Sequence, residues 1–226
     1  METGYWGVQG LGQPMRLLIA QTGEKWTDKK YTMENAQEWF AQDKPDMAKS
    51  TNFPNLPYLK DGDFTVTQSG AILRYLGDKF GYMGKDVKTR ANSEILFGVL
   101  FDLWQTFYKL QTSGENYAKN KAETLEKIKT TLGPVCAHLK QNKFMAGDDL
   151  TWVDFYAIYL LTVVSAWSND IKKMPEIASY LENTIAACSD SFRAYWQDTN
   201  DNLPLIMKPY WQWGDKPINQ LEAETF

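Results

Sequence analysis

The chain has 226 residues, of which 43% are hydrophobic and 14% aromatic, and its formal net charge is −4. This composition predicts a packed globular protein with one large domain or two small ones. It contains no basic cluster of the kind that a nucleic-acid surface needs, and its best apolar run, 155–164, is shorter than the roughly 20 residues of a membrane helix.

The chain contains few histidines and cysteines. The single histidine, His138, excludes metal sites built on several histidines, and its place in an apolar helix pattern favours a structural role. The two cysteines, Cys136 and Cys188, lie on helical patterns, and no leader-like segment follows Met1. We therefore expect free thiols, a cytoplasmic location, no metal and no cofactor.

The first third of the chain predicts a βαβ unit followed by ββα. The βαβ unit has a strand at 4–8, a loop at 9–12, a helix from Pro14 closed by Gly23, and a strand at 26–32. A short helix at 36–42 and a loop containing Pro45 follow. Gly10-Leu11-Gly12 resembles the start of a dinucleotide-binding fingerprint, but the third glycine of that motif is absent, so we discard this interpretation.

The ββα unit, 53–76, organises the predicted site. Asn55-Leu56-Pro57 opens a strand, Asp61-Gly62 predicts a tight turn, and 64–66 returns as the partner strand. Because Pro57 has no N–H, the chain before it keeps backbone groups that a neighbouring strand does not fully use. A cis Leu56-Pro57 bond would turn the Leu56 backbone outward.

Ser69 begins the next helix, whose apolar face is Ile72, Leu73, Leu76 and Phe80. Its hydroxyl lies beside helix-start amides without partners, which makes a site for a carboxylate or phosphate. The plain alternative is an ordinary N-cap serine. The overall order, with a proline entering the third strand, predicts a thioredoxin-like domain.

The rest of the chain reads as helical. We predict a domain at 1–81, a linker at 82–88 and an all-helical domain at 89–226. One apolar stripe runs through Ile95, Val99, Leu103 and Phe107, widened by Leu96, Leu100 and Leu110. A second apolar stripe, 125–139, is expected to kink or break at Gly133-Pro134. Thr151 and Asp154 fit a capping box at the start of the next helix. Two more helices are predicted, one from Pro175 and one at 191–197. The aromatic tail, with Tyr210, Trp211 and Trp213, is expected to pack back and wall an apolar pocket.

The chain resembles the cytosolic glutathione transferases, above all their mu class, in four blocks that occur in the family's order: GYWGVQGLGQPMRLL, YTM, FPNLPYLKDG and TQSGAILRY. The resemblance implies an α/β thioredoxin-like, glutathione-binding domain followed by an all-α domain. It also implies an enzyme that joins the glutathione thiolate to electrophilic, mostly apolar small molecules. Glutathione would be a co-substrate, and the protein a homodimer.

The resemblance also assigns site residues. Tyr5, which taken alone is a half-buried strand aromatic, becomes the hydroxyl that stabilises the thiolate and lowers its pKa. The residues implied to bind glutathione are Trp6 and Leu11 at the thiol, Trp39 and Lys44 at the glycine carboxylate, Asn55, Leu56 and Pro57 at the cysteinyl amide, Gln68 and Ser69 at the γ-glutamyl end, and Asp102 reaching the partner subunit's glutathione. A plain surface aspartate is the alternative for Asp102.

Some positions depart from the mu pattern. The segment between Tyr31 and Phe53 is shorter, Gly70 replaces an asparagine, and the C-terminus is longer. The tyrosine that assists some mu enzymes aligns with Thr112, and Tyr108, one helical turn earlier, is the alternative. Two other functions stay open, namely a non-catalytic subunit of a larger assembly and a carrier of apolar ligands.

Overall fold

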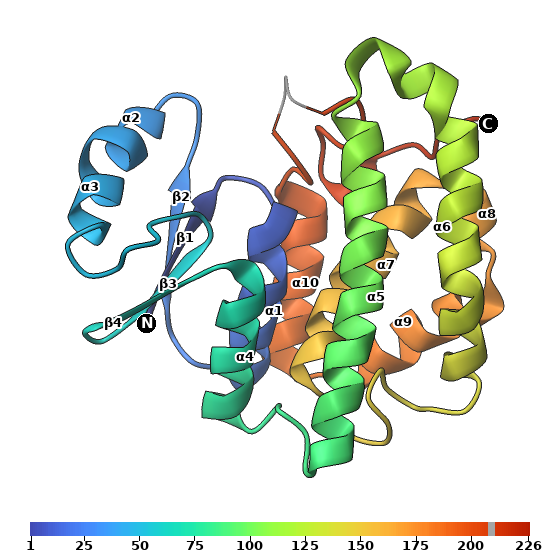
Figure 1. The fold of residues 1–226 in the computed structure, drawn as a ribbon, viewed down its shortest axis with the longest axis horizontal. Helices are drawn as coiled ribbons and strands as arrows, with labels where there is room; N and C mark the ends of the chain where they lie inside the picture. Colours follow the sequence, from blue (N-terminus) through green and yellow to red (C-terminus); the bar gives the residue numbers. More distant parts are fainter. Residues whose placement is uncertain (208–210) are drawn as a thin grey trace.

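Helices cover both faces of a four-stranded sheet in the computed structural model, which describes residues 1–207 and 211–226 (Figure 1). The strand order is β2-β1-β3-β4, with β1 parallel to β2 and antiparallel to β3, and β3 antiparallel to β4. The strands are β1 (Glu2–Trp6), β2 (Thr27–Tyr31), β3 (Tyr58–Asp61) and β4 (Phe64–Thr67). This is the predicted βαβ-ββα order.

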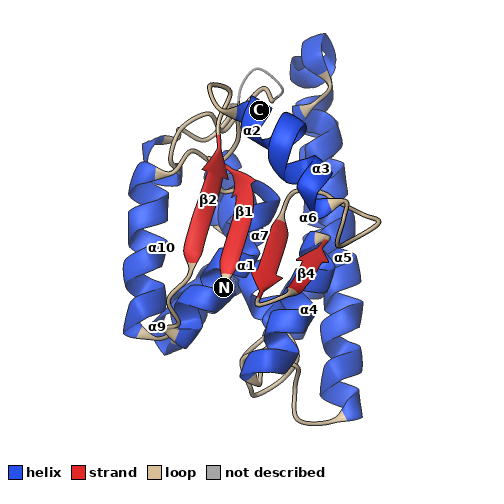
Figure 2. Cartoon of the chain, turned by 90° about the vertical axis from the view of Figure 1, so that its left-hand side faces the viewer, coloured by secondary structure: helices blue, strands red, loops and turns tan. Residues whose placement is uncertain are grey.

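The two faces of the sheet carry different helices. Helices α1 (Gln13–Thr22) and α4 (Ser69–Phe80) lie between the sheet and the helical domain, as Figure 2 shows from the side of the strands. The other face carries α2 (Ala36–Glu38), a π-helical turn (Trp39–Asp43) and α3 (Lys44–Met47). A small core of Tyr31, Trp39, Met47 and Tyr58 fills that side.

The second domain is built around one apolar helix. Its long helices are α5 (Val87–Gln111), α6 (Tyr117–Leu139), α7 (Trp152–Trp167), α9 (Pro175–Ala187) and α10 (Asp190–Asn202), with a short α8 (Asn169–Lys172). Most of α7 is buried, because α1, α4, α5 and α9 all pack against it. Among the described residues, no helix is both long enough and apolar enough to cross a membrane.

The predicted capping box fixes the start of α7. The Asp154 carboxylate accepts hydrogen bonds from the Thr151 amide at 2.8 Å, the Met145 amide at 2.7 Å and the Tyr180 hydroxyl at 2.8 Å. The Thr151 hydroxyl donates to it as well, at 2.9 Å. Asp154 is fully buried, and this burial raises the pKa of its carboxyl while the four donors partly offset the shift. His138 has the expected structural role, since its Nε2 donates to the Met145 carbonyl at 2.8 Å.

Several local predictions were wrong. The first strand spans 2–6 instead of 4–8, and the segment around Pro45 is helical because proline is tolerated in the first turn of α3. Ile95 is 63% exposed, so the buried face of α5 runs through Leu96, Leu100, Leu103, Phe107 and Leu110. Of the expected kink or break at Gly133-Pro134, the break does not occur, because α6 continues past Pro134 to Leu139. The predicted 191–197 helix is longer, at 190–202.

Candidate functional site

Tyr5 lies near the end of β1, paired in register with Lys30 of β2. Its hydroxyl oxygen accepts a hydrogen bond from the Leu11 amide at 3.2 Å. That bond uses the acceptor side of the oxygen and leaves its proton for another acceptor. Tyr5 is therefore arranged as a hydrogen-bond donor to whatever lies beside it.

Two glycines let the following loop pass closely over the Tyr5 ring. A Cβ built at Gly12 would lie 2.6 Å from Tyr5 Cδ1, and one at Gly10 would lie 2.9 Å from the Tyr5 hydroxyl. Gly10 also has φ +39°, a conformation that side chains rarely adopt. The Gly-Leu-Gly sequence is thus explained by close contact with Tyr5, which places the Leu11 amide at the hydroxyl.

The Tyr5 hydroxyl remains protonated at neutral pH. Burial raises its pKa above the ordinary 10.0, and the Leu11 amide and the Arg16 charge only partly offset this. A neutral phenol donates a hydrogen bond, whereas a phenolate could not. The electrostatics therefore support a donor role for Tyr5.

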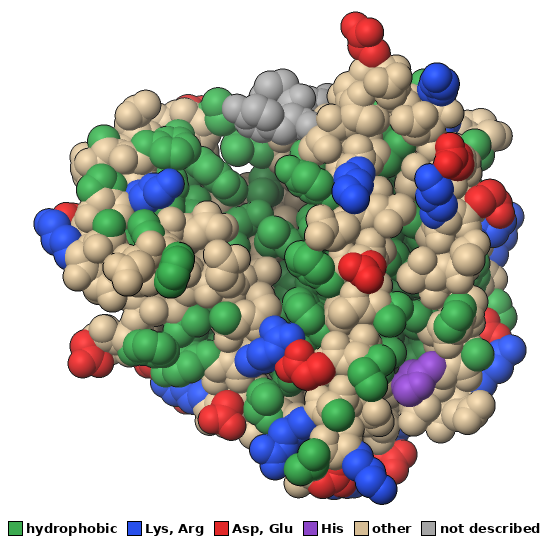
Figure 3. Space-filling view, in the orientation of Figure 1, with side chains coloured by type: hydrophobic (Ala, Val, Ile, Leu, Met, Phe, Trp, Pro, Cys, Tyr) green, Lys and Arg blue, Asp and Glu red, His purple; other side chains and the backbone are tan. Residues whose placement is uncertain are grey.

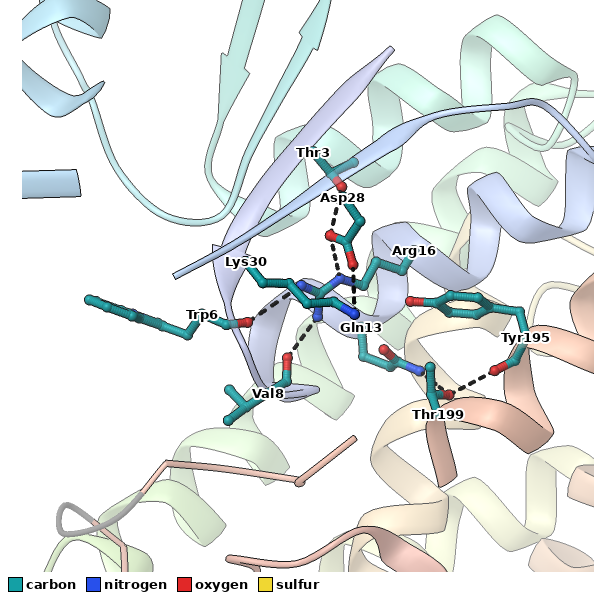
Figure 4. Close-up of polar contacts among 9 residues, drawn as sticks. All are labelled: Thr3, Trp6, Val8, Gln13, Arg16, Asp28, Lys30, Tyr195 and Thr199. Atoms are coloured by element: carbon teal, nitrogen blue, oxygen red, sulfur yellow. Dashed lines mark hydrogen bonds and ion pairs between the residues drawn. The ribbon is translucent and has the colours of Figure 1, made fainter. Parts of the chain in front are cut away.

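Arg16 on α1 is a buried charge that sequence reasoning missed (Figure 4). Its Nε bonds Asp28 Oδ1 at 3.0 Å, and its guanidinium donates to the Val8 carbonyl at 2.7 Å and the Trp6 carbonyl at 3.4 Å. The guanidinium carbon lies 5.8 Å from the centroid of the Tyr5 ring. Arg16 thereby fixes the chain on either side of the turn that follows Tyr5.

The hairpin and the start of α4 form the second part of the site. The Leu56-Pro57 bond is cis, which is the alternative that the sequence raised. Leu56 is half-buried and Asn55 is exposed, and β3 begins immediately after Pro57. Leu56 and Pro57 therefore lie immediately before the first residue of β3.

Gln68 immediately precedes α4, and Ser69 is its first residue. Gln68 is exposed and has φ +72°, and among the described residues it is the only non-glycine with positive φ. A residue held in such a conformation often belongs to a functional site. Ser69 is the first helical residue, so the first amides of α4 have no partners within the helix.

The three other predicted glutathione ligands differ in their burial. Trp39 is 3% exposed, and its ring stacks on Tyr58 with a centroid distance of 6.2 Å. Lys44 is exposed at the start of α3, and Asp102 is exposed on α5. The small aromatic core accounts for Trp39 without a ligand, and the assigned roles of all three residues stay predictions.

A cavity of about 380 Å³ lies between the two domains, beside Tyr5. Figure 3 shows the hollow on this face, with hydrophobic side chains gathered in it. The predicted Trp6 and Leu11 both line it. Its other lining residues come from four separate parts of the chain, namely Tyr5, Val8 and Gly10; Met33, Ala36 and Phe40; Trp104 and Tyr108; and Ile206, Met207 and Trp211. Tyr5 thus faces a largely apolar space.

The C-terminal segment forms one wall of this cavity, as the sequence predicted. The Trp211 ring centroid lies 5.4 Å from that of Trp104 and 5.6 Å from that of Tyr108. The neighbouring Trp213 amide donates to the Gln111 side chain at 3.1 Å, which ties the segment to α5. Tyr210, the third aromatic residue of the predicted tail, lies outside the described residues.

The tail continues over the helical domain to its end. The Glu224 amide donates to the Trp167 carbonyl at 2.8 Å, and its carboxylate pairs with Lys121 at 2.9 Å. The terminal Phe226 ring lies edge-on to Trp167, with centroids 4.9 Å apart. These bonds hold the tail against α6 and α7.

Tyr108 and Thr112, the two candidates for the position of the assisting tyrosine, differ in whether they line the cavity. Tyr108 lines the cavity and is 44% exposed, whereas Thr112 is exposed and its hydroxyl donates to the Tyr108 carbonyl at 2.9 Å. Among the described residues, only Tyr108 of this pair lines the cavity.

The cysteines are free, as expected, but are unsuited to nucleophilic chemistry. Burial raises the pKa of Cys188 to about 12, and burial also raises the pKa of Cys136. Because the thiolate is the reactive form, neither thiol is activated.

Comparisons with known proteins show the family to which the chain belongs. The glutathione S-transferase N-terminal domain matches residues 1–78, and the C-terminal domain of the same family matches residues 93–187. Glutathione S-transferase Mu 2 of Macaca fascicularis is 35% identical over 166 residues, which are 71% of this chain and 74% of that protein. The chain belongs to the glutathione S-transferase family. The class-mu 26 kDa isozyme 51 of Fasciola hepatica is 29% identical over 196 residues, covering 80% of this transferase and 88% of that protein.

Solved structures confirm the predicted fold of this transferase, a thioredoxin-like domain followed by a helical one. The glutathione S-transferase Blo t 8 superposes with a TM-score of 0.82 at 26% identity, covering 95% of this chain and all of that one. A Pi-class transferase of Onchocerca volvulus has a TM-score of 0.77 at 20% identity, covering 93% of this chain and 99% of that chain.

Sequence reasoning on this transferase missed most of the apolar lining. Met33 and Phe40 come from the segment that departs from the mu pattern, and both are exposed at the cavity. Trp104 is buried on α5 beside Leu103, but it was not among the residues of the predicted apolar stripe. The signal that the sequence offered was the apolar type of Met33 and Phe40 in and beside an otherwise polar segment.

Proposed function

We propose that this glutathione S-transferase joins the glutathione thiolate to apolar electrophiles, with the thiolate stabilised by the Tyr5 hydroxyl. The observation that carries the proposal is the placement of a protonated Tyr5, fixed by the Leu11 amide at 3.2 Å, on the wall of an apolar cavity between the domains. Membership of the family supports glutathione as the thiol.

The chemistry follows from hydrogen bonding to sulfur. A free thiol has a pKa of about 8.5, so at neutral pH only a few per cent of it is the reactive thiolate. Donation from Tyr5 favours the charged sulfur and brings its pKa toward neutrality. The thiolate then attacks an electrophilic carbon and forms the new C–S bond, while the leaving group departs or, in an addition, a proton is taken up.

The rest of glutathione would extend from the cavity to α4. The γ-glutamyl carboxylate fits the unpaired amides at the start of α4, with Gln68 and Ser69 beside it. The cysteinyl amide would pair with the Leu56 backbone as an added strand. Trp6 and Leu11 would contact the thiol, and Asn55, Pro57, Trp39 and Lys44 keep the roles that the resemblance gives them.

The second substrate would lie on the aromatic wall. The cavity lining carries Trp104, Tyr108 and Trp211 but no charged side chain among the described residues, which suits neutral apolar electrophiles. We assign Tyr108, not Thr112, as the hydroxyl that assists electrophiles developing negative charge.

We also propose a homodimer in the cytoplasm. Phe53 is 71% exposed and Ile95 is 63% exposed, and a dimer contact would cover both apolar side chains; Asp102 lies on the same helix as Ile95. In a dimer, Asp102 would reach the partner's glutathione. Phe53→Asp should shift sedimentation toward the monomer, whereas Phe226→Asp, at an exposed phenylalanine packed on Trp167, should not.

The test of the function combines binding and turnover. The transferase should be retained on immobilised glutathione and should conjugate a generic aryl halide. A carrier of apolar ligands would bind a hydrophobic dye in the cavity without turnover, and a structural subunit would neither be retained nor turn over. Absence of turnover with a panel of aryl halides and epoxides, in protein that is retained, would overturn the catalytic proposal.

A further inference from the structure

The loop that carries the Leu11 amide is tied to the helical domain by a buried glutamine. Gln9 is fully buried, and its Nε2 donates to the carbonyls of Thr199 and Leu203, both at 3.1 Å. The backbone of the same loop adds two bonds, from the Gln9 amide to the Pro204 carbonyl at 2.8 Å and from the Gly10 amide to the Leu205 carbonyl at 3.0 Å. Among the described residues, the Leu11 amide of this loop is the only hydrogen-bond partner of the Tyr5 hydroxyl.

The loop is therefore held from two sides. Arg16, within the first domain, bonds the carbonyls of Trp6 and Val8 (Figure 4). Gln9, in contrast, bonds the end of α10 in the second domain. Leu11 follows two residues later, so a shift of Gln9 would move the amide that meets Tyr5.

A second glutamine, Gln13, is buried in the same way and also bonds Thr199, but it lies in α1 and not in the loop. Gln13, in the first turn of α1, is also fully buried and donates from Nε2 to the Thr199 hydroxyl at 2.9 Å. The Oε1 atoms of both glutamines are buried without a hydrogen-bond partner. An unpaired buried acceptor lowers stability, so packing alone would be served better by an apolar side chain at either position.

We propose that Gln9 is a positioning residue, which through its bonds to Thr199 and Leu203 keeps the Leu11 amide on the Tyr5 oxygen and so couples the second domain to the reacting thiol. This rests on the proposed role of Tyr5. When the Leu11 amide stays in place, the Tyr5 oxygen has its acceptor side occupied and its proton is directed to the sulfur. When the loop drifts, the hydroxyl can rotate and donate elsewhere.

The test compares Gln9→Met with Gln13→Met, since methionine keeps the length of the side chain and removes the amide from each. The full-length protein is titrated with glutathione bound, and the thiolate is followed by its ultraviolet absorbance. Gln9→Met should raise the apparent pKa of the bound thiol by about half a unit and lower kcat about threefold at neutral pH, with a near-normal KM for glutathione. Gln13→Met should lower the melting temperature comparably but leave the thiol pKa in place.

The outcomes separate the possible failures. Equal pKa shifts in both variants, or none in either, would overturn the positioning role and leave a plain domain contact. Tyr5→Phe is measured in the same series: if it leaves the thiol pKa unchanged, the proposed function itself fails. If Gln9→Met does not fold, Gln9→Asn replaces it, because its shorter amide no longer reaches α10, and the same shifts are required.

Discussion

Trp211→Ala tests whether the C-terminal segment walls the second-substrate site. The ring is half-buried between Trp104 and Tyr108, at 5.4 and 5.6 Å between centroids. If half of a tryptophan's roughly 200 Å² is buried, about 100 Å² at about 25 cal/mol per Å² gives about 2.5 kcal/mol of unfolding free energy lost. A substrate that covers about 50 Å² of the remaining ring would lose about 1.2 kcal/mol of binding, or about eightfold in KM.

The assay is steady-state kinetics with each substrate varied separately, together with urea unfolding. The KM for an aryl electrophile should rise about eightfold while the KM for glutathione and the pH profile stay near wild type. Trp26→Ala is the matched control, because Trp26 is also half-buried and pairs with Tyr195 at 5.5 Å but does not line the cavity. An unchanged electrophile KM, or an equal rise for glutathione, would refute the reasoning.

Three further predictions follow from the same contacts. Asp154→Ala should lower the unfolding free energy by about 3 kcal/mol or more, because it leaves the Thr151 and Met145 amides and the Tyr180 hydroxyl without their acceptor. Chemical denaturation measures this loss. Asp154→Asn should lose less unfolding free energy, and an equal loss in the two variants would contradict the prediction. Tyr108→Phe should slow epoxide opening about tenfold and leave aryl halide substitution nearly unchanged, because only the former needs a proton for the new alkoxide; equal slowing would remove the assigned role. Because the pKa of Tyr5 is raised above 10.0, kcat/KM should rise with pH as the thiol ionises and then stay level up to pH 10. A decrease of kcat/KM with rising pH that begins before pH 10 would show that the Tyr5 phenol ionises in the working range.

Local patterns predicted those parts of the transferase that local interactions specify. The hairpin at Asp61-Gly62, the helix start at Ser69 and the capping box at Thr151 each depend on a few neighbouring residues, and each was confirmed. The four blocks of family resemblance pointed to Tyr5, Trp6 and Leu11, and all three line the cavity.

What escaped prediction depends on contacts between distant residues. Arg16 sits in an apolar helix pattern, and its burial makes sense only with Asp28 and the Val8 carbonyl in place. Trp39 begins the π-helical turn and stacks on Tyr58, which lies 19 residues further along the chain. The Gln9 bonds to Thr199 join residues that are far apart along the chain, so no local pattern could show them.

The direct test of the thiolate account is the ultraviolet titration of bound glutathione in wild type and in Tyr5→Phe. Removing the hydroxyl should raise the apparent pKa of the thiol by about 1 to 2 units and lower kcat about 10- to 100-fold at neutral pH, while the affinity for glutathione changes little. A variant whose thiol titrates at the wild-type pH and reacts at the wild-type rate would contradict the account.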